Sequence, residues 1–268
     1  MGVQKSAQNL SSDTVVGIAP HSLRAVSAAD LTDALARNPG GPVHIHIAEQ
    51  VPEIEEIKAA RGARPVEWLL ANAEVDQRWC LIHATHMTSD ETRRVAKSGA
   101  VAGLCPITEA NLGDGIFNGA EYFGADGHFG VGSDSNVNIS LTEELRLLEY
   151  SQRLRDQQRN VLAPEGGSTG ERLYLGAALG GAQALGRDAG TISVGALADL
   201  VAIDSSAPSL CALSDTQLLD GLVFAAKDQV VTDVWSAGRH QVRYGRHIAE
   251  TEIETEFRNA IQDLVDRF

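Results

Sequence analysis

Short apolar runs alternate with amphipathic segments between residues 14 and 150. We interpret five of the runs as buried strands of a parallel sheet, because strand, helix and parallel strand in alternation give this pattern. The pattern therefore predicts an α/β fold. The five runs are TVVGIAP at 14–20, PVHIHIA at 42–48, WCLIHA at 79–84, AVAGLC at 100–105 and HFGVGSD at 128–134.

The polar segments between these runs carry the start and stop signals of helices. SAADLTDALARN begins with Ser27 as a capping residue, and PEIEEIKAARG ends at Gly62. PVEWLLANA opens with a proline, and TSDETRRVAKSG runs from a capping residue to Gly99. Such signals mark helix ends. Each segment is expected to be a crossover helix between parallel strands.

The pattern changes after residue 134. LTEELRLLEYSQRLRDQQRN and TGERLYLGAALGGAQALG predict two longer helices, whereas β-branched alternation from about residue 190 predicts short antiparallel strands. The tail TEIETEFRNAIQDLVDRF returns to helical spacing and is expected to cover this small β unit. The predicted divisions are a disordered or non-native leader at 1–13, an α/β unit at 14–189, a small β unit at 190–250 and a helix at 251–268.

Composition excludes several classes of protein. The formal charge of -14 gives no electrostatic support for nucleic-acid binding. No run of about 18 apolar residues occurs, so no membrane span is expected. The three cysteines lack a CxxC spacing, which argues against disulfides and cysteine zinc sites and favours a cytoplasmic protein.

His46, His83 and Asp134 each lie at or near the C-terminal end of a predicted strand. Parallel-barrel enzymes assemble their catalytic groups at this edge. Imidazole nitrogens and carboxylate oxygens suit Zn²⁺, and a zinc ion with an open position turns water into a nucleophile near neutral pH. The three residues therefore indicate metal-dependent hydrolysis.

Glu49 and His44, two residues near His46, each allow two interpretations. Glu49 can move protons beside a metal, or it can simply complement the dipole of the following helix, where Glu53, Glu55 and Glu56 are expected to be surface carboxylates. His44 shares a strand face with His46. Both histidines could hold a metal, but we favour His46 as the ligand and His44 as a deeper, hydrogen-bonded neighbour. We expect structural or surface roles for the histidines that have no comparable placement, His86, His128, His240 and His247.

These motifs, in this order, resemble those of amidohydrolase-superfamily deaminases. The phrases GALADLVAID and DVWSAGRHQVRYGRH resemble the small β domain of those enzymes. Within the superfamily, three phrases are most similar to the formimidoylglutamate deiminases. They are PHSLRAVS at 20–27, VHIHIAEQ at 43–50 and TEANLGDGIF at 108–117.

The resemblance implies roles for the residues at the strand ends. His46 and Asp134 would hold one Zn²⁺ per site, and Asp134 would also take a proton from water. Glu49 and His83 would assist at the tetrahedral centre. The implied reaction is hydrolysis of N-formimino-L-glutamate to N-formyl-L-glutamate and ammonia, in histidine degradation.

The resemblance also implies how the substrate is bound. His21 and Arg24 would hold this small molecule, and a guanidinium suits a carboxylate because it forms two parallel hydrogen bonds. A surface arginine that opens a helix is the alternative interpretation of Arg24. The complete enzyme is expected to be a homodimer.

One departure from the resembled family is large. Those enzymes carry a further HxH pair upstream, whereas this sequence has one HxH, at His44 and His46. The chain is therefore expected to supply five of eight barrel strands and part of the small β domain, to bind zinc weakly, and to associate through open sheet edges. The alternatives are a related aminohydrolase with another substrate, such as imidazolonepropionate or guanine, and a catalytically dead fragment.

Overall fold

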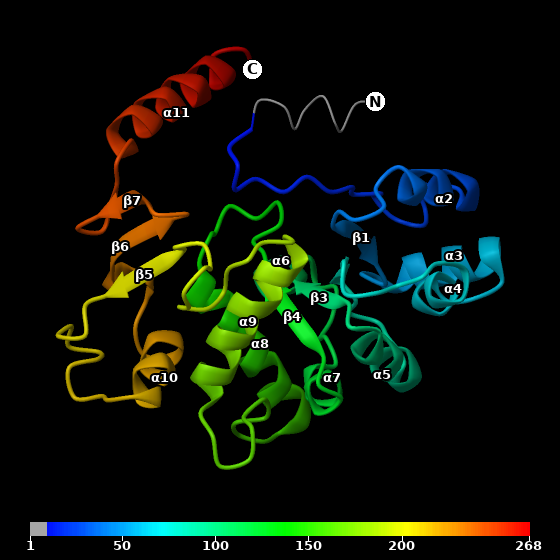
Figure 1. Cartoon of the computed structure of the whole chain (residues 1–268), viewed down its shortest axis with the longest axis horizontal. Helices are drawn as coiled ribbons and strands as arrows, with labels where there is room; N and C mark the ends of the chain where they lie inside the picture. Colours follow the sequence, from blue (N-terminus) through cyan, green and yellow to red (C-terminus); the bar gives the residue numbers. More distant parts are fainter. Residues whose placement is uncertain (1–9) are drawn as a thin grey trace.

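The computed structural model describes residues 10–268 and contains one parallel and one antiparallel sheet (Figure 1). The parallel sheet has the order β1-β2-β3-β4, so strands that follow one another in the chain lie side by side. The α/β interpretation of residues 14–150 is confirmed. The strands are β1 Val43–Ile47, β2 Trp79–His83, β3 Val101–Leu104 and β4 His128–Val131.

The expectation of a fifth strand at 14–20 is wrong for the described chain. This segment meets β1 in one isolated parallel bridge, between Ile18 and Val43, and a second one follows beyond it, between Ser22 and His46. It lies at the sheet edge, and Pro20 has no N–H to donate. The part of the predicted leader at residues 1–9 lies outside the described residues.

The capping signals are confirmed by the helices they predicted. Ser27 caps α2 by accepting the N–H of Asp30, while Gly62 and Gly99 end α3 and α5 in the left-handed conformation. The short helices α6, α7 and α10 were not predicted. The helices up to residue 224 are α2 Ala28–Ala36, α3 Val51–Arg61, α4 Pro65–Asn72, α5 Ser89–Ser98, α6 Pro106–Leu112, α7 Gly119–Gly124, α8 Leu141–Asp156, α9 Thr169–Ala184 and α10 Thr216–Phe224.

Side-chain alternation along β1 orients the candidate residues. Val43, Ile45 and Ile47 are fully buried in the hydrophobic core. Because successive side chains of a strand point to opposite faces, His44 and His46 lie on the other face of β1. The apolar positions of this strand thus fix the direction of its two histidines.

Helix α9 packs unusually close to β4. A Cβ atom on Gly180 would lie 1.9 Å from the carbonyl oxygen of Phe129, and one on Gly130 would lie 3.1 Å from the Cα of Gly181. The two backbones can approach this closely only because glycine has no side chain. Gly180 in α9 and Gly130 in β4 thereby allow the helix to pack against the strand that leads to Asp134.

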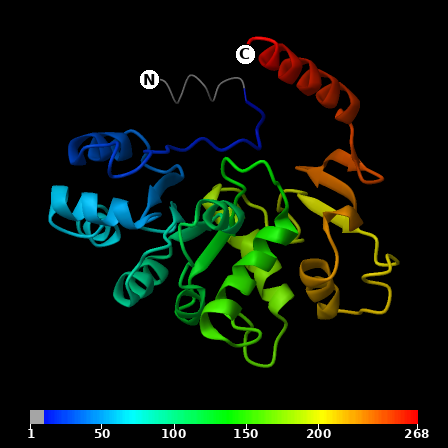
Figure 2. The same cartoon turned by 180° about the vertical axis from the view of Figure 1, so that it is seen from behind.

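The small β unit is antiparallel, as predicted. Its strands are β5 Leu200–Ile203, β6 Val231–Ser236, β7 Arg239–Arg243 and β8 Arg246–His247, with a short 3₁₀ helix at Asp228–Val230. Figures 1 and 2, which view the chain from opposite sides, both show this sheet beside the α/β unit.

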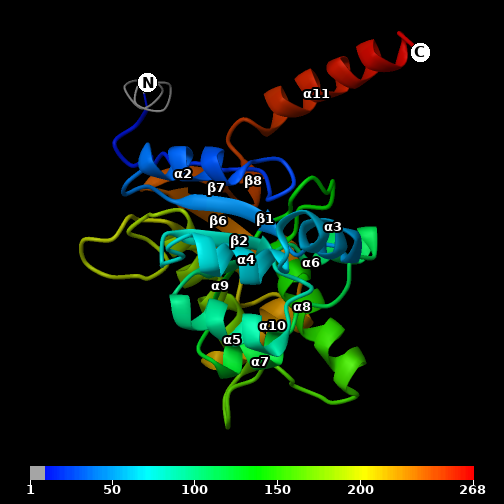
Figure 3. The ribbon, with the colours of Figure 1, turned by 90° about the vertical axis from the view of Figure 1, so that its right-hand side faces the viewer.

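The tail helix α11, Glu250–Val265, does not cover the small sheet, so that expectation is wrong. None of its residues is buried, and it projects away from the body of the chain (Figures 1 and 3). Its apolar side chains, such as Phe257 at 64% exposure, face solvent rather than β5–β8. Within the described residues, no helix combines the length and apolar character of a membrane span.

Candidate active site

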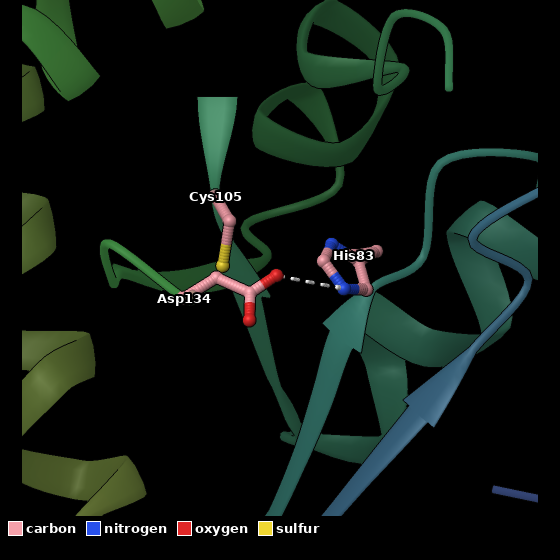
Figure 4. A group of neighbouring side chains, drawn as sticks. All are labelled: His83, Cys105 and Asp134. Carbon is pink, nitrogen blue, oxygen red and sulfur yellow. Dashed lines mark ion pairs between the residues drawn. The ribbon is translucent and has the colours of Figure 1, made fainter. Parts of the chain in front are cut away.

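The ends of the parallel strands bring His46, His83 and Asp134 together, as the sequence predicted. The His46 and His83 rings stack with their centroids 5.7 Å apart. Nε2 of His83 lies 3.8 Å from Oδ2 of Asp134 (Figure 4). His46 and His83 lie at the ends of the adjacent strands β1 and β2, and Asp134 follows β4. The shared strand direction thus creates one cluster from distant positions in the chain.

A backbone contact selects one tautomer of the neutral His46 ring. Its Nδ1 lies 2.8 Å from the carbonyl oxygen of His21. A carbonyl can only accept, so Nδ1 carries a proton and donates it, and in the neutral ring Nε2 then has the lone pair. The ring of His21 lies beside it, with the centroids 5.0 Å apart. His46 is therefore in the tautomer that binds a cation through Nε2.

His83 is buried between carboxylates. Its Nδ1 lies 3.2 Å from Oε1 of Glu109, and its Nε2 lies 3.8 Å from Oε1 of Glu49. Burial disfavours the imidazolium, but the hydrogen bond to Glu109 and the charges of Glu109, Glu49 and Asp134 outweigh it and raise the pKa of His83. The surroundings of His83 thus favour positive charge.

Asp134 and Cys105 complete the cluster. Oδ1 of Asp134 accepts the N–H of Ser135 at 2.7 Å, while Oδ2 faces His83. Within the described residues, one donor atom each from His83, Cys105 and Asp134 lies within 4.8 Å of the others, and Figure 4 shows the three side chains. Burial raises the pKa of the Cys105 thiol, so the neutral thiol is favoured. This placement of Cys105 could not be predicted from the sequence, because no other candidate ligand lies near it in the chain.

Glu53 shapes the loop that carries Glu49, and its prediction as a surface carboxylate is wrong. Its side chain is 1% exposed, and its two oxygens accept the N–H groups of Ala48 and Glu49 at 3.0 and 2.9 Å. These two hydrogen bonds fix the backbone where it leaves β1, and this directs Glu49 toward His83. Glu55 and Glu56 are exposed, as predicted.

A further buried carboxyl, Glu144, lies in the same electrostatic environment. Burial raises its pKa to about 7, with smaller contributions from neighbouring carboxylates that include Glu109 and Asp134, while the N–H of Ile107 lowers it. Oε2 accepts that N–H at 2.9 Å, but Oε1 has no hydrogen-bond partner among residues 10–268. The concentration of acidic groups around His83 makes this end of the sheet favourable for a cation.

Apart from His21, the other histidines do not join the cluster. Nε2 of His44 donates to the carbonyl of Ala184 at 2.7 Å, so His44 is the hydrogen-bonded neighbour that the sequence analysis favoured. His86, His128 and His240 each bond to another part of the chain. His247 is exposed.

Arg24 lies apart from the cluster in this structure. Its guanidinium lies 3.9 Å from Oε2 of Glu56, and both side chains line a hollow of about 650 Å³. The lining residues do not include His46, His83 or Asp134. Arg61 stabilises the turn that contains Arg24 by donating to the backbone carbonyls of Leu23 and Val26. The structure therefore brings His21 to the cluster and leaves Arg24 paired with Glu56.

Comparisons with known sequences find relatives over most of the chain. A model of the amidohydrolase family matches residues 3–240. Formimidoylglutamate deiminase of Pseudomonas aeruginosa is 47% identical over 94% of this chain and 56% of its own length. A 5-methylthioadenosine/S-adenosylhomocysteine deaminase of Natronomonas pharaonis is 30% identical over 92% of this chain and 56% of its own length. The chain thus spans little more than half the length of these relatives.

Solved structures show the same likeness. An amidohydrolase from Brucella melitensis is 52% identical and superposes with a TM-score of 0.88 over 93% of this chain and 55% of that structure. An adenosine deaminase from Xanthomonas campestris with bound zinc is 27% identical, with a TM-score of 0.79 over 91% of this chain and 57% of that structure.

Proposed function

The chain belongs to the amidohydrolase family, and we propose that its site is that of a metal-dependent deiminase that hydrolyses N-formimino-L-glutamate to N-formyl-L-glutamate and ammonia. The observation that carries this proposal is the 47% identity to a formimidoylglutamate deiminase over 94% of the chain. The convergence of His46, His83 and Asp134 supports it, because hydrolysis at a C–N bond needs proton transfer and charge stabilisation at one point.

We propose that the four-stranded parallel sheet is part of a (β/α)₈ barrel. Its support is the TM-score of 0.88 to the Brucella amidohydrolase, which covers 55% of that structure. In a barrel, the carboxyl ends of the strands form the catalytic face. The division at residue 189, a homodimer in the complete enzyme and a cytoplasmic location stay predictions.

The donor set at the strand ends fits a divalent metal such as zinc. The His21 carbonyl occupies Nδ1 of His46, so Nε2 is the nitrogen free for a metal, and Asp134 presents Oδ2 next to His83. Nitrogen and oxygen donors of this kind suit zinc, and the backbone carbonyl at Nδ1 of His46 is the usual second partner of a ligating histidine. We propose that His46 and Asp134 hold the metal. A bound divalent metal supplies a Lewis acid that makes water a nucleophile near neutral pH.

The chain's own residues would move the protons of the reaction. Water adds to the formimino carbon, and the bond from this carbon to its terminal nitrogen breaks, so that nitrogen leaves as ammonia. Asp134 would take a proton from the attacking water. Glu49 and His83, whose Oε1 and Nε2 atoms lie 3.8 Å apart, would deliver protons to the leaving nitrogen. Such assistance is worth roughly 10² to 10⁴ in rate.

Substrate binding calls for fixed positive charge, since N-formimino-L-glutamate carries two carboxylates. We propose that Arg24 binds one of them and His21 lies beside the reacting group. The contact between Arg24 and Glu56 is long, at 3.9 Å, and the two side chains are 37% and 60% exposed. An exposed pair of this kind contributes little to stability. Arg24 can therefore exchange Glu56 for a substrate carboxylate at little cost.

Replacing Arg24 by Met is expected to raise KM for N-formimino-L-glutamate and to lower kcat/KM by about 10² to 10³, because a lost charge contact impairs substrate positioning. Metal content should not change. Steady-state kinetics with elemental analysis measures both. Arg37→Met is the matched control, because Arg37 is also exposed and also paired with a carboxylate, Asp33. Near-normal kcat/KM in the Arg24 variant would refute this substrate assignment.

A further inference from the structure

We propose that Glu109 is a positioning residue that fixes the tautomer of His83, with the proton on Nδ1 and the lone pair of Nε2 directed toward Glu49 and Asp134. The inference depends on the proposed function only for the use that the reaction makes of this lone pair. The tautomer itself follows from contacts within the described chain and can be measured without turnover.

The contact between Glu109 and His83 is buried on both sides. His83 is 1% exposed and Glu109 4% exposed, and Oε1 of Glu109 lies 3.2 Å from Nδ1 of His83. Few waters can reach this contact, so the two side chains must satisfy each other. One of the two atoms has to donate.

The chemistry of the carboxylate decides which of the two atoms donates. Oε1 of Glu109 also accepts the backbone N–H of Cys105 at 2.9 Å. A carboxylate oxygen has no proton to donate, so Oε1 accepts from both of these neighbours. The proton shared with His83 therefore belongs to Nδ1. In the neutral imidazole, Nε2 then has no proton and can accept one.

The fold holds Glu109 rigidly in this place. Helix α6 begins at Pro106, directly after Cys105 at the end of β3, and β3 lies next to the strand that ends in His83. The backbone N–H of Glu109 donates to the backbone carbonyl of Cys105, and the backbone carbonyl of Glu109 accepts the N–H of Asp114 at 2.9 Å. A second-sphere carboxylate on a rigid element is the arrangement that orients catalytic and metal-binding histidines.

The competing explanation is that Glu109 only caps the chain at Cys105. On that explanation, removal of the carboxylate would lower stability but leave His83 in its tautomer. The two explanations thus differ in a property of the His83 ring, and NMR of ¹⁵N-labelled histidine reads this property directly.

The test compares the metal-free wild-type chain with Glu109→Met and Glu109→Gln, at a pH where His83 is neutral. Met has a similar length but no acceptor, whereas Gln keeps an acceptor oxygen. Long-range ¹H–¹⁵N spectra should show His83 protonated on Nδ1 in the wild type and in Glu109→Gln. In Glu109→Met, His83 should shift toward the Nε2-protonated tautomer that free imidazole favours.

An internal control comes from His46, whose Nδ1 donates to the carbonyl of His21 and whose tautomer should be the same in all three proteins. A wild-type His83 protonated on Nε2 would overturn the inference, even if the Met variant fails to fold. An unchanged His83 in a folded Met variant would also overturn it. If the tautomers behave as expected but the wild type releases no ammonia from N-formimino-L-glutamate, the proposed function fails and the role of Glu109 stands.

Discussion

Asn in place of Asp134 is expected to lower ammonia release from N-formimino-L-glutamate by at least about 10³-fold, since the proposed function makes Asp134 both a metal ligand and a proton acceptor. The affinity for zinc should fall by at least about 10-fold. Asn has nearly the same shape, and its oxygen can still accept the N–H of Ser135, so folding should be retained. Ammonia release and zinc titration by calorimetry measure the two effects.

Asp126, at the opposite end of β4, offers a close control for Asp134. Asp126 precedes β4 and Asp134 follows it, and both have left-handed backbones, with φ of 58° and 53°. Asp126→Asn therefore repeats the chemical change and the backbone setting at the opposite end of the strand. It should leave ammonia release and zinc binding unchanged. Equal losses in both variants would show that Asp134 acts through the fold and not at the site.

Ala in place of Gly180 is expected to cost at least about 3 kcal/mol of unfolding free energy. The new Cβ would lie 1.9 Å from the carbonyl oxygen of Phe129, and no side-chain rotation can relieve a collision with backbone. Helix α9 would have to move off β4, with loss of packing around Phe129. Urea unfolding followed by circular dichroism measures the change.

The neighbouring glycine separates this collision from helix propensity. A Cβ on Gly181 would meet no atom within 4 Å, although Gly181 lies in the same helix. Gly181→Ala should therefore stabilise the chain by up to about 1 kcal/mol. Equal stability of Gly180→Ala and Gly181→Ala would show that α9 does not approach β4 as closely as the structure has it.

The strand ends were predictable because they follow from periodicity alone. Apolar alternation in VHIHI fixes the face of β1 on which His46 lies, and parallel strand direction then brings His83 and Asp134 to the same edge. The caps at Ser27 and Gly99 were predictable for a similar reason. Each depends on residues only a few positions apart.

The supporting carboxylates were not predictable, since their roles depend on which donors the fold brings to them. Glu53 looks like any acidic residue at a helix start, yet it accepts two N–H groups of the preceding loop. Glu109 meets His83 across 26 positions of the chain. Nor could the sequence show that Arg24 points toward Glu56, because periodicity fixes the direction of a strand residue but not of a residue in a turn.

Ammonia release by the purified chain, supplied with zinc, tests the proposed deiminase function most directly. Wild-type protein given N-formimino-L-glutamate should release ammonia and N-formyl-L-glutamate in equal amounts, and a chelator should stop the release. 5-Methylthioadenosine, the substrate class named for the relatives near 30% identity, should release none. No ammonia from N-formimino-L-glutamate in the presence of zinc, or faster release from 5-methylthioadenosine, would contradict the proposed function.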